Sequence, residues 1–493
     1  MNSPRLAAGK LQPVGLIAVL ALVGWVRWRF LNTALERDEG EFAYGAQRIL
    51  AGNLPYVSFH AMKLPGIYWA YAAALSLFGE TARGVHLGLL VVNLASIVLV
   101  YAIGTKLFES GAGLASAAAF GLLTLAPTVQ GTQAQAEHFV ILWLLAGALL
   151  LVYQRWIFVA GLCFGMALVT KQHGAVFGLA ALLSCGRRWP LLLAGWMAPL
   201  AVTSVVMASL GAWDQFVFWT WSYPREYATQ VPIGYAPQMF RITAPQVFLW
   251  CAPLWILGAA GIIVRWRRLA LPALAAVAAI LPGWLFQSHY FLFLIPVVSL
   301  GVGGIASWLR GLPALGAVAW CAISLGVFYA RHTPSSLMVE MYQDSFFNES
   351  PDIAKFLVEN TQPGDAIGVL ASEPQICFYA GRPSASPHIY MYPLVENHQY
   401  AQQMQEELAA DIERAAPKYL VYSGDDSTWL YHQGAPRHVY LWAQQYLTDH
   451  YYFVGRVECF QGKPSKLAWT AEALEIPPET DRWIGIYRRK AGH

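Results

Sequence analysis

Residues 12–330 form a series of long apolar runs separated by short polar connections, whereas residues 331–493 have ordinary polarity. A helix that crosses a membrane needs about 20 mostly apolar residues. Only 12% of the chain is charged, whereas a soluble domain has about 25% charged residues. We therefore predict an α-helical polytopic membrane domain over residues 1–330 and a small α/β soluble domain over residues 331–493.

Eleven apolar runs are predicted to be membrane spans: 13–31, 84–105, 112–129, 138–153, 157–170, 173–186, 190–210, 245–264, 269–286, 290–308 and 312–330. The first run follows Arg5 and Lys10 and lacks a small-residue cleavage site. We therefore expect a retained first span rather than a removed signal peptide.

Basic residues orient these spans, because cytoplasmic connections of membrane proteins are enriched in Lys and Arg. With the N-terminus in the cytoplasm, every inner connection has a basic residue: Lys106, Arg155, Arg187, Arg188, Arg265, Arg267, Arg268 and Arg310. The non-cytoplasmic side then holds the first outer loop (32–83), the connections around 130–137, 171–172 and 287–289, the loop 211–244, and the soluble domain. A bacterial inner or plasma membrane is the expected location.

Two segments of the first outer loop are predicted to be helices that lie along the outer membrane surface. Gly66–Gly79 is apolar but has only 14 residues, which is short for a span. Counting it as a span would also place Lys106 outside. Glu41–Leu50 has apolar residues at helical spacing, which suits an interfacial helix.

Charged residues lie directly beside the spans in the first outer loop, where ionised groups are costly and tend to be functional or paired. Asp38, Glu39 and Glu41 lie within four positions, and Lys63 follows in the same loop. These carboxylates can be functional, or they can form a solvated acidic turn paired with a nearby arginine.

Other outer connections contain single candidates, each with an ordinary structural explanation. Glu137 and His138 begin a span, where a carboxylate is stabilised by the helix dipole. Lys171 can hold an anion or extend to the interface from a helix end. His289 and Tyr290 begin another span, where a histidine is commonly a local hydrogen-bonding residue.

The loop 211–244 is rich in aromatic residues and also contains Arg225 and Arg241. Its aromatic residues are Trp213, Phe216, Phe218, Trp219, Trp221, Tyr223, Tyr227 and Tyr235. This composition is typical of an interfacial belt, and it also suits a surface that grips a lipid tail and stacks on a sugar.

Taken together, these acidic and basic residues lie on one predicted side of the membrane. A carboxylate can take a proton from an acceptor, and a cation can hold a leaving phosphate. This combination favours an enzyme that transfers a group from a lipid phosphate.

Residues 36–79, which contain RDEGEF and MKLPG, resemble the first outer loop of the GT-C superfamily of membrane glycosyltransferases. Residues 134–143 (AQAEHFVILW), 168–177 (LVTKQHGAVF) and 287–303 (QSHYFLFLIPVVSLGVG) resemble later motifs of its protein-O-mannosyltransferase-like branch, which includes lipid A aminoarabinose transferases. Residues 350–382 resemble the α/β domain of bacterial members.

The resemblance implies a hexosyl- or pentosyltransferase that moves a sugar, with inversion, from a polyprenyl-phosphate donor to a glycan, lipid or protein acceptor. Asp38 then matches the family's general base, and Glu39 matches the second half of its acidic pair, which would bind the acceptor or orient the site. Lys63 matches the lysine that holds the carrier phosphate, and Glu137 matches a second acidic position. Met62 replaces the carboxylate that precedes this lysine in aminoarabinose transferases, which argues against aminoarabinose as the sugar.

His138, Lys171, Arg225, His289 and Tyr290 are the further predicted substrate-binding residues. No metal site is assigned, although Asp38, Glu137 and His138 could gather a divalent cation. The expected partners are the donor, the acceptor and membrane lipids. Nucleic acid is not expected, because the net charge of +3 is small and scattered.

The C-terminal segment is predicted to alternate helices and strands. Helices are expected over 351–360, 396–415 and 437–448, and strands over 367–370, 418–422, 451–458 and 483–488. Asp425 and Asp426 are expected to be solvated turn residues. Cys377 and Cys459 are either a disulfide or two buried thiols.

Two other functions fit the same spans. A transporter or lipid flippase would more often show repeated halves and charges at the membrane midplane. A non-catalytic lipid-binding relative would lack the acidic pair, which this chain retains as Asp38 and Glu39.

Overall fold

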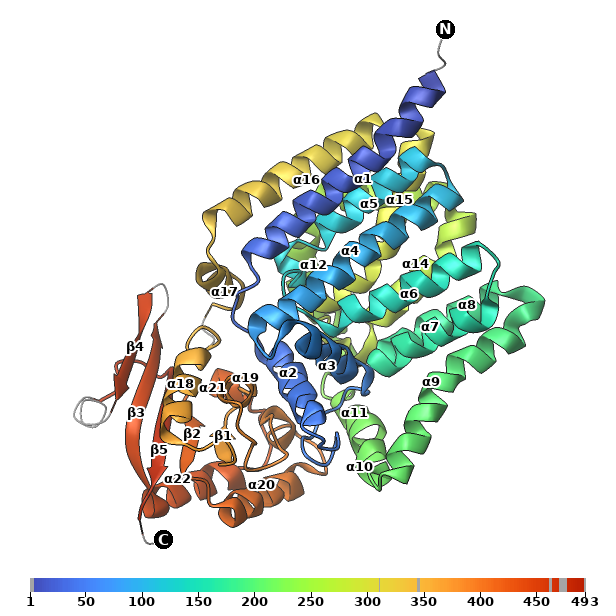
Figure 1. Ribbon diagram of the computed structural model, residues 1–493. Coiled ribbons are helices and arrows are strands. Elements are labelled where there is room, and N and C mark those ends of the chain that lie inside the picture. Colours follow the sequence, from blue (N-terminus) through green and yellow to red (C-terminus); the bar gives the residue numbers. More distant parts are fainter. Residues whose placement is uncertain (1–3, 310, 344–345, 461–462, 470–476, 492–493) are drawn as a thin grey trace.

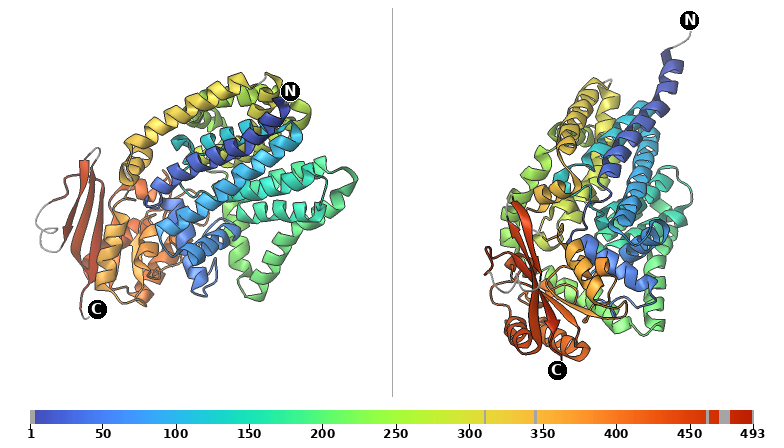
Figure 2. Two further views of the ribbon diagram at one scale, coloured as in Figure 1. Left: turned by 45° about the horizontal axis from the view of Figure 1, so that its top comes forward. Right: turned by 60° about the vertical axis from the view of Figure 1, so that its left-hand side comes forward.

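The apolar part of the chain folds into a bundle of long helices, and an α/β domain packs against one end of it (Figure 1). The computed structural model describes residues 4–309, 311–343, 346–460, 463–469 and 477–491. Figure 2 shows from two further sides that the two parts touch through the short helices at the lower end of the bundle.

Each of the eleven predicted apolar runs is helical over most of its length. The bundle helices are α1 (Pro4–Arg29), α4 (Ala82–Leu107), α5 (Ser110–Leu123), α6 (Ala136–Val152), α7 (Ile157–Thr170), α8 (Ala175–Ser184), α9 (Trp189–Ser209), α12 (Ala236–Leu249), α13 (Ala252–Val264), α14 (Trp266–Ile280), α15 (Ile295–Trp308) and α16 (Leu312–Arg331). Short 3-10 turns join them: η1 (Pro127–Val129), η2 (Gln172–Gly174), η3 (Gly186–Arg188), η6 (Pro282–Trp284) and η7 (Ser288–Leu294).

Among the described residues, four helices are long and apolar enough to cross a membrane: Ala82–Leu107, Gly186–Ser209, Ser288–Trp308 and Leu312–Arg331. A fifth span results if α12 and α13 count as one, although they are bent by 103°. Helices such as α7 and α8 contain only 14 and 10 residues, fewer than a comfortable span needs. The count of eleven spans therefore stays a prediction.

Close helix packing in the bundle depends on glycine. A Cβ atom on Gly261 of α13 would lie 1.8 Å from the Gly301 carbonyl oxygen of α15, and one on Gly301 would lie 2.2 Å from the Gly258 oxygen. Small residues allow helix backbones to approach closely where lipid supplies no hydrophobic drive between helices. These glycines therefore fix the position of α15, whose preceding turn η7 leads to the site described below.

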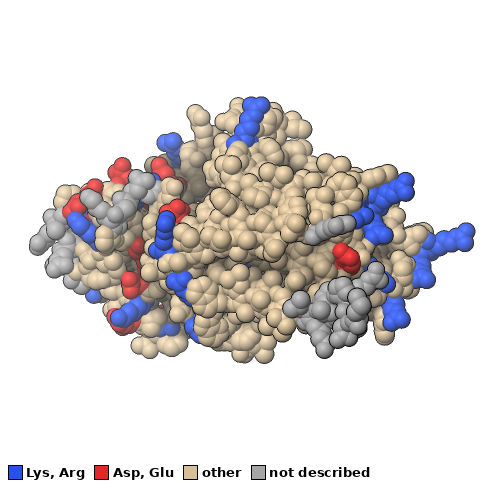
Figure 3. Space-filling model, turned by 90° about the horizontal axis from the view of Figure 1, so that it is seen from above, with Lys and Arg blue, Asp and Glu red and all other residues tan. Residues whose placement is uncertain are grey.

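Basic side chains gather at the end of the bundle far from the α/β domain, and few charges lie across the middle of the face in Figure 3. Lys106 lies over the Tyr153 ring at 5.0 Å, Arg188 donates to the Gln154 carbonyl at 3.0 Å, and Arg268 donates to the Leu107 carbonyl. These contacts join basic connections that the charge pattern assigns to one side. The compartment that they face stays a prediction.

Helices α2 (Arg37–Leu50) and α3 (Gly66–Phe78) lie at the other end of the bundle, between it and the α/β domain (Figure 1). Both were predicted as interfacial helices. The apolar face of α2, however, contacts protein rather than lying open to lipid, because Phe42 packs on Tyr68 and Tyr71. On another side of α2, a Cβ atom on Gly40 would lie 2.7 Å from the backbone nitrogen of Gln375.

The loop 211–244 contains four short helical elements: α10 (Trp213–Val217), η4 (Phe218–Ser222), α11 (Tyr223–Tyr227) and η5 (Ile233–Tyr235). Its aromatic side chains divide between two environments. Phe216, Trp219 and Tyr223 are buried, whereas Trp221 and Tyr235 are exposed. The loop therefore serves partly as core and partly as an aromatic surface.

The C-terminal domain contains a five-stranded sheet in the order β1-β2-β5-β3-β4. Strand β1 pairs in parallel with β2, with Ile367 beside Tyr419, and the remaining pairs are antiparallel. The elements are α17 (Pro334–Tyr342), α18 (Ser350–Asn360), β1 (Ile367–Leu370), α19 (Gln375–Ala380), η8 (Tyr392–Leu394), α20 (Ala401–Ala415), β2 (Tyr419–Ser423), α21 (Asp426–Trp429), α22 (His438–His450), β3 (Tyr451–Phe460), β4 (Lys463–Trp469) and β5 (Trp483–Arg489).

Most predicted elements of this domain are present, with two differences. Helix α20 begins at Ala401 rather than at residue 396, because residues 392–400 form a turn and a loop instead. Asp425 is not a solvated turn residue: it is 5% exposed and caps α21 by accepting from the Ser427 amide. Asp426 is exposed, as expected. Cys377 and Cys459 are free, buried thiols.

Candidate functional site

The first turn of α2 carries Asp38, and a capping box fixes its position. The Glu36 carboxylate accepts from the amides of Asp38 and Glu39 at 3.0 and 2.9 Å, and the Glu39 carboxylate accepts from the Glu36 amide at 3.2 Å. Such a cap satisfies amides that a helix start leaves without partners. Burial and the neighbouring acids Asp38 and Glu39 raise the pKa of Glu36.

Asp38 lies between two parts of the chain that are far apart in sequence. Its Oδ1 atom accepts a hydrogen bond from the Tyr390 hydroxyl of the C-terminal domain at 3.0 Å and lies 3.9 Å from Lys63 Nζ. Its side chain is 26% exposed. Burial favours the neutral acid, but the charges of Lys63, His289 and Lys171, together with the Tyr390 hydrogen bond, lower the pKa of Asp38 to about 2. Asp38 is therefore an accessible, ionised carboxylate.

Lys63 is buried among carboxylates. Its Nζ atom lies 3.3 Å from Glu41 Oε2 and 5.5 Å from the centre of the Phe42 ring. Burial opposes its charge, but Asp38 and Glu41 raise the pKa of Lys63 well above its usual value. Glu41 also accepts from the Tyr68 hydroxyl. The ammonium group therefore stays charged, donates to Glu41 and lies beside Asp38.

The loop that carries Lys63 is fixed against the end of α7. The Gln172 side chain donates to the Met62 carbonyl at 2.8 Å, and a Cβ atom on Gly66 would lie 2.7 Å from the Val169 carbonyl oxygen. These contacts place Lys63 on the same side of the site as Lys171, which ends α7.

A second charged cluster lies at the mouth of the bundle. Lys171 Nζ lies 2.5 Å from Glu137 Oε1 and 4.6 Å from the centre of the Tyr290 ring. His289 Nε2 lies 3.9 Å from the same Glu137 oxygen. The other oxygen of Glu137 is buried and makes no hydrogen bond within the described residues. Glu137, Lys171, His289 and Tyr290 therefore form one cluster, in which an unpartnered carboxylate oxygen remains.

The two clusters adjoin, because the charges of His289 and Lys171 lower the pKa of Asp38 in addition to the larger effect of Lys63. The structure thus brings together six of the nine predicted site residues: Asp38, Lys63, Glu137, Lys171, His289 and Tyr290. Lys63 lies beside the Asp38 carboxylate, and Lys171 and His289 of the second cluster act on it electrostatically. Such a site can hold an anionic group beside a base.

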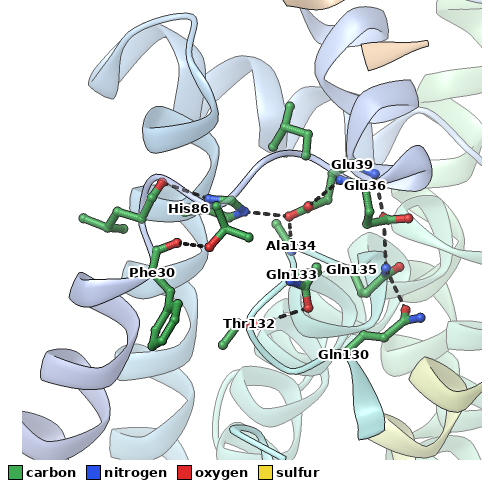
Figure 4. Close-up of polar contacts among 12 residues, drawn as sticks. Phe30, Glu36, Glu39, His86, Gln130, Thr132, Gln133, Ala134 and Gln135 are labelled. Carbon is green, nitrogen blue, oxygen red and sulfur yellow. Dashed lines mark hydrogen bonds and ion pairs between the residues drawn. The ribbon is translucent and has the colours of Figure 1, made fainter. Parts of the chain in front are cut away.

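Glu39 is buried beneath this space, where its contacts suit the second of its two predicted roles, orienting the site, rather than contact with the acceptor. It is fully buried, and its Oε1 atom lies 2.9 Å from His86 Nε2 and 2.5 Å from the Ala134 amide (Figure 4). Adjacent residues of a helix point about 100° apart, so the Glu39 side chain points away from the space that Asp38 faces. Glu39 joins α2 to α4 and to the loop before α6.

A chain of hydrogen bonds extends from this cap to His289. The Gln135 amide donates to Glu36 Oε1 and to Gln130 Oε1, each at 3.0 Å (Figure 4). Gln130 Oε1 in turn lies 3.1 Å from His289 Nδ1. Gln130 has a left-handed φ of 55°. The buried Arg27 holds its loop by donating to the Gly131 carbonyl at 2.8 Å. Gln130 thus orients His289. It was not among the site residues predicted from the sequence.

His138 and Arg225 lie outside the two clusters. His138 is 2% exposed within α6, and its Nε2 atom makes no hydrogen bond within the described residues. Arg225 is exposed and stacks over the Trp221 ring at 5.4 Å. Arg225 therefore lies on the aromatic surface of the loop 211–244.

The C-terminal domain completes the site, which sequence reasoning could not place. Besides the Tyr390 hydrogen bond, Arg37 donates to the Ser372 carbonyl at 2.6 Å and to Glu373 at 3.0 Å. The backbone amide of Ser384 donates to the Tyr44 hydroxyl at 2.7 Å. Several hydrogen bonds therefore hold α2 against this domain, and one of them is made by Asp38 itself.

The described residues contain no group of three or more His, Cys, Asp or Glu side chains that could hold a metal ion. Asp38, Glu137 and His138 are therefore not gathered as a ligand set. Glu137 is instead bound by Lys171.

Comparison with known proteins gives one family match and several structural matches. Residues 60–213 match the family model of dolichyl-phosphate-mannose-protein mannosyltransferase. No curated protein matches the sequence. The chain is similar in structure to ArnT from Cupriavidus metallidurans in the apo state, with 18% identity, a TM-score of 0.51, and coverage of 76% of this chain and 86% of that chain. The chain is also similar to ArnT from the same organism bound to undecaprenyl phosphate, with 18% identity, a TM-score of 0.51, and coverage of 85% of this chain and 93% of that chain. At this identity the likeness shows the fold, and that fold is the one expected from the sequence.

Proposed function

We propose, from its place in the GT-C superfamily beside the mannosyltransferase-like and ArnT-like proteins, that this membrane protein transfers a sugar from a polyprenyl-phosphate donor to an acceptor, with Asp38 as the general base. The observation that carries this proposal is an accessible, ionised carboxylate beside two buried lysines. Lys63 lies 3.9 Å from Asp38, and the charge of Lys171 also lowers its pKa.

Donor binding follows from the cations. Lys63 and Lys171 would hold the phosphate, and His289 would add a hydrogen bond or, when protonated, a third charge. Charge-assisted hydrogen bonds to phosphate are strong. The phosphate is the leaving group of the transfer, and its growing charge is stabilised by the same groups. One base and fixed cations therefore suffice, without a strong general acid.

The transfer is a single displacement in this proposal. The acceptor oxygen attacks the anomeric carbon from the face opposite the phosphate and loses its proton to Asp38. The bond from the anomeric carbon to the phosphate oxygen breaks, and polyprenyl phosphate leaves with both bonding electrons. This geometry inverts the anomeric centre.

Donor binding would also activate the base. The pKa of Asp38 is about 2 because Lys63, His289 and Lys171 oppose its protonation. A bound phosphate neutralises part of that positive charge, so the pKa of Asp38 rises. A stronger base then exists only when the donor is present, which limits reaction without it.

The proposed site faces the non-cytoplasmic side of the membrane, as the Lys and Arg distribution predicts. A membrane-impermeant maleimide should modify Asn53→Cys in intact cells, but Arg187→Cys only after permeabilisation. Both positions are exposed, and the unsubstituted chain gives the background of its native cysteines. The reverse labelling pattern would place the site in the cytoplasm and contradict the proposal.

The direct test uses purified protein in lipid nanodiscs with labelled polyprenyl phosphates that carry hexoses or pentoses. Cleavage of at least one donor to polyprenyl phosphate, lost in Asp38→Asn, is the expected result. Movement of the lipid between leaflets without cleavage would instead show a flippase. Binding without cleavage or movement would show a non-catalytic lipid-binding protein.

A further inference from the structure

Two cavities meet at the rings of His60 and Trp219. The inner cavity is also lined by Glu41, Tyr390 and Tyr392, and the Tyr390 hydroxyl donates to Asp38. The outer groove opens to the surface and is also lined by Asp214, Phe218, Tyr400, Gln403 and Glu407. The outer groove and the inner cavity therefore lie on either side of this ring pair, and the inner cavity reaches the tyrosine that contacts the proposed base.

Three rings form the junction, and each comes from a different part of the chain. His60 of the first outer loop stacks on Trp219 of η4, with ring centres 4.6 Å apart and an interplanar angle of 26°. The edge of its ring meets His388 of the C-terminal domain, with ring centres 4.4 Å apart. Because the junction is shared by all three parts, it forms only in the assembled protein.

The groove combines aromatic surfaces with hydrogen-bond acceptors. Phe218 and Tyr400 pack edge to face with ring centres 5.0 Å apart, and both rings line the groove. Glu407 is 47% exposed at the mouth, and its Oε2 atom lies 3.4 Å from His388 Nε2. That nitrogen is buried, with the Glu407 carboxylate beside it. Aromatic faces cover the apolar faces of sugar rings, and carboxylates and imidazoles bond their hydroxyls.

Specific bonds hold the two walls of the groove together. The Tyr223 hydroxyl of α11 donates to Glu396 Oε2 at 2.8 Å, and the Gln399 amide donates to Glu226 Oε1 at 2.7 Å. The loop 211–244 is thereby fixed onto residues 396–400. A fixed groove binds a ligand without a large ordering cost.

We infer that this groove is the acceptor subsite of the proposed transferase and that the acceptor is a carbohydrate of neutral or positive charge. The inference rests on the proposed function and names the acceptor class that the function leaves open. Charge sets the preference, because Asp214 and Glu407 line the groove and no Lys or Arg is among its described lining residues. An anionic acceptor would be repelled at this mouth.

Saturation-transfer NMR on the purified full-length protein, without donor, tests the inference. The probes are mannotriose and cellotetraose (neutral), a chitosan trimer (cationic), trigalacturonate (anionic) and a peptide rich in Ser and Thr. Phe218→Ala and Tyr400→Ala each remove one aromatic ring from the groove. Glu407→Gln removes a negative charge from an exposed position. Tyr452→Ala is the matched control, because this tyrosine is 54% exposed on β3.

The wild type and Tyr452→Ala should bind a neutral or cationic oligosaccharide, and each aromatic variant should bind it about tenfold more weakly. Glu407→Gln should narrow the gap between neutral and anionic probes, and it tests the groove even if an aromatic variant fails to fold. Oligosaccharide binding that is unchanged in all three groove variants would overturn the inference. So would binding of the peptide alone or preference for trigalacturonate. Donor cleavage by the wild type tests the proposed function separately.

Discussion

Asp38 and Glu137 are both carboxylates beside a buried lysine, but their environments differ. Asp38 is 26% exposed, 3.9 Å from Lys63, and hydrogen-bonded by Tyr390. Glu137 is fully buried, and its Oε1 atom lies 2.5 Å from Lys171. The loosely held carboxylate can change partners during a reaction, whereas the tightly held one keeps a lysine in place. Two acidic residues that look alike in sequence are therefore expected to do different work.

Asp38→Asn should abolish transfer, whereas Glu137→Gln should only weaken it. General base catalysis contributes roughly 10²–10⁴-fold to a rate, and the asparagine keeps the size and the Tyr390 contact but cannot take a proton. Glu137→Gln still accepts a hydrogen bond from Lys171, so its main effect should be on the KM for the donor. Turnover of each variant at saturating donor, with thermal unfolding as the control for folding, measures this difference. Near-normal turnover in Asp38→Asn would exclude Asp38 as the base.

Lys63→Ala should weaken use of the donor about ten- to a hundredfold, the scale of a lost charge-assisted hydrogen bond. The KM for the acceptor should change less. Lys171→Ala offers the matched comparison, because it removes the cation of the other cluster. Equal losses for donor and acceptor in Lys63→Ala would contradict phosphate binding.

The pH profile of Lys63→Ala sharpens the same point. The positive charge of Lys63 is the leading influence that lowers the pKa of Asp38 to about 2, so its removal raises that pKa. In the wild type, the acid limb of kcat/KM that is due to Asp38 should lie well below pH 4. In Lys63→Ala this limb should move to higher pH. An unmoved limb would mean that another group titrates there.

Much of this comparison was visible in the sequence, because charge next to apolar runs marks the mouth of a membrane site. The helices α2 and α3, the two lysines and both carboxylates were expected, and strand β1 was predicted with its observed bounds. Glu41 was among the candidate carboxylates of the first outer loop, and residues three apart share a helix face. It lies three residues after Asp38 and contacts Lys63.

Other features depend on distant contacts that no local pattern contains. Tyr390 meets Asp38 across 352 residues of sequence. Glu39 was expected beside Asp38, but the helix turns it inward to His86 and Ala134. Arg225 was expected to bind substrate as part of the aromatic loop 211–244, and its place over the exposed Trp221 ring leaves that role a prediction. Spacing predicts faces of helices, and only the fold decides which face meets which domain.

Tyr390→Phe should slow transfer about three- to tenfold, the cost of one hydrogen bond worth about 1 kcal/mol. The phenylalanine keeps the ring packing but donates nothing to Asp38, so the pKa of Asp38 should rise and its orientation should loosen. Tyr379→Phe provides the control, because its hydroxyl accepts from the Leu35 amide of the same loop at 2.8 Å and does not touch Asp38. Equal rates for the two variants would show that the C-terminal domain supports α2 without acting on the base.

Arg225→Ala should change donor and acceptor use by less than about twofold, the smallest effect among these variants. Exposed substitutions away from buried polar networks usually alter stability by less than about 0.5 kcal/mol. The guanidinium group of Arg225 lies over the ring of Trp221, which is itself exposed. A loss as large as that of Lys63→Ala would mean that the loop 211–244 swings inward when the donor binds. Arg225 would then be a third cation, beside Lys63 and Lys171, that reaches the phosphate only when the donor is bound.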